Sequence, residues 1–273
     1  MATPKTLLQI ISTAQQELGL PQAITVIGNT DPTTQQMLGL LNAAGEELRD
    51  EPEGGWTVMQ AEYNLVVSVP ITTTGDLTAN SPIITNIPST TGLSINYTVS
   101  GSSIAQAARV LSVDSATQVT MTMESTGTAT ATELVFARDT YALPSDFKNY
   151  QNRSWWDRTN RWELLGPDSP QMDQWHRSGI VATGPRRHFR QIGHAASQYR
   201  LWPPPAEIAA PLQLVFEYLS TDWVNLTNSG SSFASYYQND TDTSFLDDRA
   251  LIMSLKWRFW KAKGFNYAGM QND

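Results

Sequence analysis

The sequence contains no cysteine among its 273 residues. This absence excludes a disulfide framework, a thiolate nucleophile and a zinc site with cysteine ligands. Long apolar runs are also missing, because nothing approaches the roughly 18 uninterrupted apolar residues that a membrane span requires. Polar side chains interrupt the first 20 residues, which therefore do not form the core of a signal peptide. We expect a soluble, unprocessed chain that has no membrane partner.

Motifs for catalysis and nucleotide binding are absent as well. The sequence has neither G-x-x-x-x-G-K-[ST] nor G-x-G-x-x-G, and it lacks a G-x-S-x-G elbow and an H-E-x-x-H pair. The only histidines are His176, His188 and His194. His188 and His194 are six positions apart, which suits neither one face of a helix nor a common zinc spacing. These absences predict a protein that is not an enzyme and has no cofactor and no metal site.

The densest group of carboxylates lies near the end of the sequence and consists of Asp240, Asp242, Asp247 and Asp248. The alternation of its first two members is similar to a calcium loop. However, Ser244 and Phe245 stand where an EF-hand needs a ligand and then a glycine. The competing interpretation is that the last two aspartates compensate the dipole of a terminal helix, which needs no ligand.

Basic residues are few and unevenly distributed in a chain with a formal net charge of −8. Nine of the 18 lie between positions 148 and 200, and five more lie between 249 and 263. An acidic chain argues against general binding to nucleic acid, although a basic subregion could face phosphates or an acidic partner. The alternative is that these cations lie over the neighbouring tryptophans.

Three segments carry apolar side chains at helical spacing, which predicts amphipathic helices over about residues 3–18, 31–50 and 243–263. A Thr-Pro and an Asp-Pro pair supply the starts of the first two helices, and Gly264 ends the third. Such helices bury little alone, so their apolar faces must meet one another or neighbouring subunits. The third is apolar around more than half of its circumference and needs neighbours on several sides.

A Ser- and Thr-rich stretch separates two strand-like segments in the middle of the sequence. Residues 70–132 hold fifteen Thr and nine Ser but one basic residue, Arg109. Short apolar runs alternate there with turn residues, which predicts a small β-sandwich or barrel inserted into a loop of a parent domain. A disordered linker is the alternative.

The segment after this stretch is rich in aromatic residues. An extended arm over 141–147 is predicted to turn into a short helix, and a second short helix is predicted to begin at Ser169 and Pro170. Alternating patterns predict strands over 197–202 and 212–218, paired antiparallel through a proline-rich turn. The nearby tryptophans are expected in a core or a subunit interface, with a stacking platform for sugars or single-stranded nucleic acid as the alternative.

Several segments resemble the head-to-tail adaptor, or head-completion, proteins of short-tailed bacteriophages. They are YALPSDF (141–147) with the Trp-rich stretch behind it, RLWPPP (200–205), FEYLSTDWV (216–224) and DTDTSFLDDRALIMSLKWRFWKAKGFNYA (240–268). The inserted stretch is similar to immunoglobulin-like domains of phage structural proteins, notably in GDLTANSPIITNIPSTTGL (75–93) and VLSVDSATQVTMT (110–122).

The predicted fold is therefore α+β. We expect a helical bundle, made of the N-terminal helix pair and the long C-terminal helix, with a small antiparallel β region and an inserted all-β immunoglobulin-like domain. The predicted domains are a discontinuous adaptor core, residues 1–67 and 136–273, and an insert, residues 68–135.

The resemblance implies a virion protein of the phage neck that is assembled in the host cytoplasm. It would form a homo-oligomeric ring, usually a dodecamer, that docks on the portal protein and connects it to a tail nozzle or tail tube protein. Genomic DNA would pass through the channel without sequence-specific binding. The candidate residues for portal or intersubunit contact are Met253, Lys256, Trp257, Arg258, Trp260, Lys261 and Lys263, followed by Trp155, Trp156 and Trp162.

Two other functions remain open at this point. The chain could be a tail-associated protein that binds or cleaves carbohydrate through the insert and the tryptophans. It could also be a head protein that binds DNA through Arg186, Arg187 and Arg190. DNA binding of that kind would depend steeply on salt concentration.

Overall fold

The structure is a computed structural model and describes residues 4–50, 56–178, 186–193, 198–205, 208–227 and 232–265. It divides into two compact units, each made of more than one chain segment. The first, here called the helical unit, comprises Met1–Ala61, Asp146–Gln151 and Glu217–Asp273. The second, here called the β unit, comprises Glu62–Ser145 and Asn152–Phe216.

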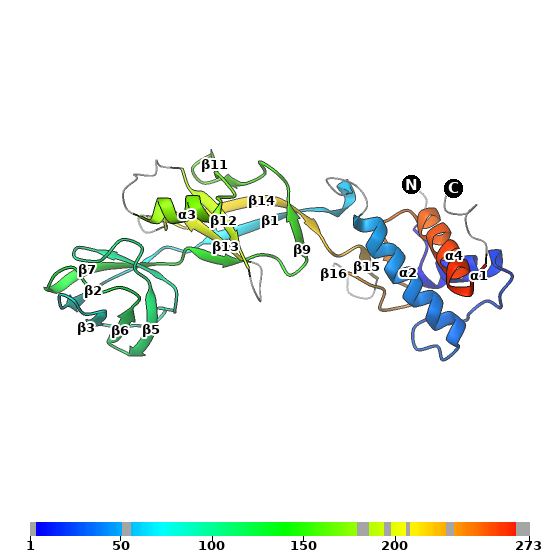
Figure 1. Cartoon of the computed structure of the whole chain (residues 1–273), viewed down its shortest axis with the longest axis horizontal. Helices are drawn as coiled ribbons and strands as arrows, with labels where there is room; N and C mark the ends of the chain where they lie inside the picture. The colour runs from blue at the N-terminus through cyan, green and yellow to red at the C-terminus, as the bar shows by residue number, and fades with distance from the viewer. Residues whose placement is uncertain are drawn as a thin grey trace. The chain divides into compact units, whose positions relative to one another are not determined.

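Strands dominate the described part of the chain, which contains seventeen of them but only four α-helices (Figure 1). The prediction of a helical bundle with a small β region is therefore wrong, although the three long helices that it named are present. Many of the strands are only two to five residues long. Strands of this length carry almost no periodic signal, and they become regular only when a partner strand supplies hydrogen bonds.

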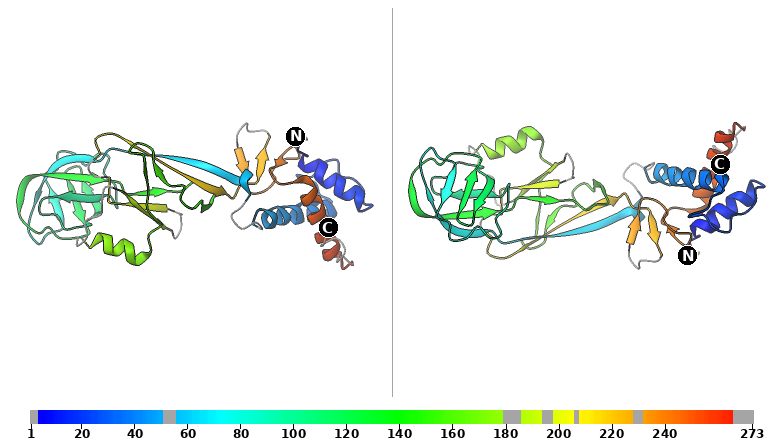
Figure 2. Two further views of the ribbon diagram at one scale, coloured as in Figure 1. Left: turned by 90° about the horizontal axis from the view of Figure 1, so that it is seen from above. Right: turned by 90° about the horizontal axis from the view of Figure 1, so that it is seen from below.

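The helical unit contains three α-helices that pack against one another (Figure 2). They are α1 (Leu7–Glu17), α2 (Pro32–Asp50) and α4 (Asp248–Lys263). The smaller elements of the unit are the 3₁₀ turn η1 (Thr57–Met59), β9 (Phe147–Tyr150), β15 (Val224–Leu226), β16 (Ser232–Ala234) and β17 (Thr243–Ser244).

Side-chain caps fix the ends of these helices. The hydroxyl of Thr6 accepts from the backbone N–H of Gln9, and the Gln9 side chain accepts from the N–H of Thr6, which is a capping box. Asp247 caps α4 by accepting from the N–H of Ala250, and Gly264 ends that helix in the left-handed conformation, as predicted. The residue predicted to begin the first helix, Thr3, lies outside the described residues.

The apolar faces of α1, α2 and α4 meet in one core that also contains Trp223 from the segment before β15. Its central side chains are fully buried and include Leu7, Ile10, Ile11, Met37, Leu41, Trp223, Leu251 and Leu255. Within the chain, the N-terminal helix pair therefore supplies most of the cover that the terminal helix needs. The side of α4 that carries Met253, Trp257 and Trp260 is less buried.

The β unit contains a six-stranded antiparallel sheet in the order β4–β7–β2–β3–β6–β5. These strands are β2 (Ile71–Leu77), β3 (Ile83–Thr85), β4 (Thr98–Gly101), β5 (Val110–Ser115), β6 (Gln118–Met121) and β7 (Ala129–Ala137). The two edges meet, because Thr98 forms an antiparallel bridge with Arg109 and the N–H of Val99 donates to the carbonyl of Ala108. The sheet thus curls round a core of its own, which includes Ile84, Val119, Leu134 and Phe136. The stretch is folded and is not a linker.

Most residues of seven further strands also lie in the β unit, and these strands form two groups. β12 (His188–Ile192), β13 (Gln198–Trp202) and β8 (Thr140–Ala142) make one sheet, and β1 (Gln60–Val67), β14 (Leu212–Ser220), β10 (Trp156–Asp157) and β11 (Trp162–Glu163) are hydrogen-bonded in that order. The predicted strands over 197–202 and 212–218 exist, but they belong to different sheets, so their predicted pairing is wrong.

Of the two short helices predicted in the aromatic-rich segment, one is present and the other is not. The helix α3 (Pro170–Arg177) begins after Ser169, whose hydroxyl accepts from the N–H of Met172, as predicted. No helix follows the arm at 145–147, where the chain continues into β9 instead. The Asp146 carboxylate there accepts from the hydroxyls of Tyr218 and Ser220, so it bonds a neighbouring strand and caps no helix.

Candidate functional site

All predicted contact residues on α4 except Lys256 occupy its less buried side. Met253, Trp257 and Trp260 are half-buried, whereas Lys261 and Lys263 are exposed. Lys256 is buried, and its ammonium group lies 2.6 Å from a carboxylate oxygen of Glu17 on α1. That hydrogen bond is the main reason why the pKa of Glu17 is lowered. Lys256 therefore ties two helices of the unit together and is not open to a partner.

Cations lie over aromatic rings along the same helix. The guanidinium carbon of Arg258 is 4.9 Å from the ring centre of Trp257, and the ammonium of Lys261 is 5.5 Å from it. Lys263 lies 5.3 Å from the ring of Phe259 in the same way. This arrangement confirms that basic side chains cover neighbouring aromatics here. We call Trp257, Arg258 and Lys261 the basic-aromatic face of α4.

The three clustered tryptophans of the β unit do not form one surface. Trp155 is 2% exposed and stacks between Phe189 and Phe216, with ring centres 4.1 and 3.9 Å away. Trp156 and Trp162 are 46% and 38% exposed. In the β10–β11 pair, Trp156 is opposite Glu163 and Trp162 is opposite Asp157. Opposite residues share a face and successive residues alternate, so the two exposed indoles point to opposite faces.

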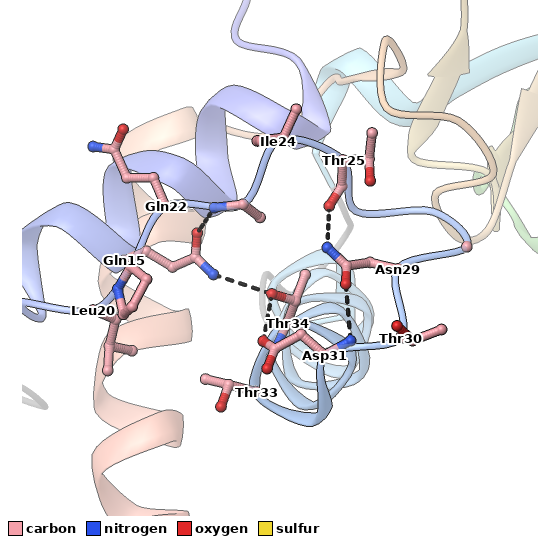
Figure 3. Close-up of a pocket in the computed structure, with 13 residues that line it drawn as sticks. Gln15, Leu20, Gln22, Ile24, Thr25, Asn29, Thr30, Asp31, Thr33 and Thr34 are labelled. Carbon is pink, nitrogen blue, oxygen red and sulfur yellow. Dashed lines mark hydrogen bonds between the residues drawn. The ribbon is translucent and has the colours of Figure 1, made fainter.

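A surface pocket of about 600 Å³ lies at the connection between α1 and α2 (Figure 3). Its buried polar side chains are engaged with each other, since Gln15 donates to the Thr34 hydroxyl at 3.3 Å and accepts from the N–H of Ala23 at 2.7 Å. Thr34 also donates to Asp31, which caps α2. These bonds hold the connection in place. The exposed Ile24 on the rim is 89% accessible.

The aspartates near the end of the sequence hold loops and a helix end. Asp240 accepts from the N–H groups of Val26 and Ile27, and Asp242 accepts from those of residues 238 and 239. Asp247 caps α4, and Asp248 accepts from the N–H of Lys5. Each carboxylate thus has a backbone partner, which matches the interpretation that needs no calcium ion.

The β unit contains a network of two buried aspartates and four partly buried arginines that the sequence analysis did not predict. Asp139 is fully buried and pairs with Arg109, and an oxygen of Asp139 lies 3.6 Å from Arg177. Asp173 is paired with Arg177 at 3.1 Å and Arg190 at 2.9 Å, while Arg200 lies 3.8 Å from it. Burial is the main cause that lowers the pKa of Arg200. Of the three arginines proposed for DNA binding, Arg190 is thus paired with a buried aspartate, whereas Arg186 is exposed.

One cluster in the β unit has the donor atoms of a metal centre. Asp168 lies between His176 of α3 and His188 of β12, and one potential ligand atom from each of the three lies within 4.8 Å of the others. Sequence reasoning considered the spacing of His188 and His194, of which the latter is outside the described residues. The sequence spacing did not indicate the pair His176 and His188, because one ring comes from a helix and the other from a strand.

The sequence matches the SU10 adaptor protein family over residues 86–273, which is more than half of the chain. The class of protein is thus a bacteriophage adaptor, and the chain belongs to the SU10 adaptor protein family. Membership indicates a structural role between head and tail, and a component of the virion. No curated protein and no solved structure matches the chain. Within the described ranges, no helix has the length and apolar composition needed to cross a bilayer.

Proposed function

We propose that this protein forms a closed ring, a dodecamer as in the proteins that it resembles, which docks on the portal and connects it to the tail nozzle or tail tube. The observation that carries the proposal is the match to an adaptor family over residues 86–273. The division into an adaptor core, residues 1–67 and 136–273, and an immunoglobulin-like insert, residues 68–135, remains part of this proposal.

The basic-aromatic face of α4 is the proposed contact with the portal or with a neighbouring subunit. It presents one indole with two cations over it, and the core beneath it is already closed by α1 and α2. Aromatic and arginine side chains contribute more to protein interfaces than other residues do, and they act best when a rigid support holds them. Arg258 is already paired with Glu47 of α2, so an acidic partner surface would complement Lys261.

Passage of DNA through the ring would require a lumen that does not hold the duplex. The chain has a formal net charge of −8, and acidic side chains around a lumen would repel phosphates. A map of the assembled ring would test this charge arrangement directly. Arginines around its narrowest part would contradict the proposed acidic lumen.

The contact proposal is tested with point substitutions, because truncation after Asp248 would remove α4 and with it four buried side chains of the helical core, Leu251, Ile252, Leu255 and Phe259. The experiment mixes purified chain with portal rings of the same phage and measures co-sedimentation and light scattering. Trp257→Ala is expected to weaken portal binding or ring formation at least about tenfold, as loss of an aromatic hot spot does.

Trp175→Ala is the matched control, because Trp175 is a 50% exposed indole on α3 of the other unit. It should leave assembly unchanged. Equal assembly by the wild type and Trp257→Ala would show that the basic-aromatic face of α4 is not the contact surface. A wild-type chain that stays monomeric and does not bind portal rings at any concentration would contradict the proposed ring.

Binding to carbohydrate has less support in this geometry. A stacking platform needs adjacent rings on one face, whereas Trp155 is buried and Trp156 and Trp162 point to opposite faces. A glycan array would reveal such an activity.

A further inference from the structure

We propose that Asp168, His176 and His188 form a binding site for one divalent transition-metal ion, of which Zn²⁺ fits the donor set best. The site lies in the β unit and is separate from the proposed contact face on α4. It would act as a structural clamp and does not depend on the adaptor function.

The three side chains already point toward one another. The Nδ1 atom of His176 is 3.0 Å from one carboxylate oxygen of Asp168, and the Nδ1 atom of His188 is 3.2 Å from the other. The two imidazole ring centres are 4.4 Å apart with planes inclined at 58°. Two rings and a carboxylate therefore surround one small volume with three potential ligand atoms facing it.

The backbone fixes this meeting point. Leu165 and His188 form a parallel bridge, in which the N–H of Phe189 donates to the carbonyl of Leu165 at 2.8 Å. The N–H of Asp168 donates to the carbonyl of Phe189 at 2.8 Å, which places its side chain beside β12. Helix α3 begins two residues after Asp168, at Pro170, so His176 in its last turn returns to Asp168.

The geometry is close to that of a zinc site. Ligand atoms about 2.0 to 2.1 Å from a tetrahedral zinc ion are about 3.3 Å from one another. Each histidine nitrogen is near this distance from one oxygen of Asp168, at 3.0 Å for His176 and 3.2 Å for His188, and the two oxygens are different. All three ligand atoms lie within 4.8 Å of one another, so any pair needs to close by no more than about 1.5 Å. A fourth position stays open for water.

Burial and access also suit a metal. The side chains of Asp168 and His176 are only 10% and 6% exposed, while that of His188 is 20% exposed and gives an ion a path inward. Each imidazole binds a metal in its neutral form, with the proton on Nε2. Zinc would thus replace the two contacts to Asp168 with metal bonds and would join α3, β12 and the segment before α3.

The test uses the full chain without a histidine tag, because it has no cysteine and only three histidines. Zinc added to metal-free protein should bind at one ion per chain, measured by calorimetry and by elemental analysis after dialysis. It should also raise the melting temperature. Cobalt should give the visible absorption of a four-coordinate site.

His176→Asn and His188→Asn are the decisive variants. The amide nitrogen of asparagine can still donate to Asp168 from near the Nδ1 position, but it is a poor zinc ligand. Each variant should lose the zinc-dependent rise in melting temperature while keeping a native circular dichroism spectrum without zinc. His194→Asn, the matched control, should bind zinc like the wild type. Asp168→Asn serves as the second variant should a histidine variant fail to fold.

Three results would overturn the site. The first is a wild-type chain that binds no zinc at micromolar concentrations. The second is equal zinc binding by the wild type and both histidine variants. The third is loss of zinc binding in His194→Asn, which would place the ligand elsewhere. In either of the last two results the cluster would be a hydrogen-bonded triad only.

Discussion

The indole of Trp223 lies directly against Gly45 in the middle of α2. A Cβ atom added at Gly45 would lie 2.2 Å from two carbon atoms of that ring. This distance is too short for carbon atoms, so the ring or the helix would have to move. Trp223 is fully buried and also packs edge-on against Tyr237, with ring centres 5.2 Å apart. The largest side chain of the helical core therefore depends on the smallest residue of the helix that it touches.

Gly45→Ala is expected to destabilise the helical unit by about 1 to 3 kcal/mol, because the indole or the helix must shift in a close-packed core. Gly39→Ala is the matched control. Gly39 is on the same helix but has no neighbouring atom within 4 Å of an added Cβ, so alanine should stabilise there by up to about 1 kcal/mol. Denaturant titration of both variants measures the difference. A stable Gly45→Ala chain would show that this contact is looser than described.

Two adjacent tryptophans in the β unit should lose very different amounts of stability when they are replaced by alanine. Trp155→Ala removes a ring stacked between Phe189 and Phe216 and should cost about 3 to 5 kcal/mol. Trp156→Ala removes a side chain that is 46% exposed and should cost under about 1 kcal/mol. Thermal unfolding followed by tryptophan fluorescence compares them. Similar losses for the two would contradict the buried stack.

Arg109 of the six-stranded sheet should be needed for the stability of the β unit. Arg109→Ala leaves the fully buried Asp139 carboxylate without its main partner and should cost about 3 to 5 kcal/mol. The control is Arg158→Ala, whose partner Glu62 and own side chain are both more than 40% exposed, and it should cost under about 1 kcal/mol. Urea midpoints measure both. Rescue of Arg109→Ala by Asp139→Asn would support the explanation.

Two aspartates of the helical unit should give opposite dependences of stability on pH. Burial and the neighbouring Asp146 raise the pKa of Asp222 above its usual value of 3.8, so its charged form is unfavourable in the folded chain. Its cost is present at neutral pH and disappears as the pH falls toward 3.8. Asp222→Asn should therefore stabilise the chain at pH 7. This gain in stability over the wild type should become smaller as the pH falls.

Asp50 behaves in the reverse way, because hydrogen bonds from Arg49 and Lys148 lower its pKa to about 2. Its contribution is complete above about pH 3.8 and is lost as the pH falls through 2. Asp50→Asn should lower the stability at pH 7, by less than about 1 kcal/mol because the carboxylate is 46% exposed and screened by solvent. Free energies of unfolding measured between about pH 2 and pH 7 compare both variants with the wild type. Parallel pH profiles for the two variants would refute this assignment of signs.

The sequence by itself determined the features that depend on neighbours along the chain. Periodic apolar residues located α1, α2 and α4, and capping side chains located the starts of α2 and α3, whereas α4 begins at Asp248 and not at the predicted residue 243. Gly264 ends α4 as its conformational freedom allows. The segments resembling phage adaptor proteins likewise lie in continuous stretches, and the family match agrees with them. In each case the signal and its structural consequence are a few residues apart.

The tertiary structure alone decided what residues distant in sequence do together. Strands as short as β10 and β11 exist because a partner supplies hydrogen bonds, so the mainly β character was hidden. Asp168, His176 and His188 meet because a backbone bridge places a helix beside a strand. Arg109 and Asp139 are thirty positions apart, and burial turns their attraction into a structural requirement. Long-range pairing has no local periodicity, and for that reason only the folded chain reveals it.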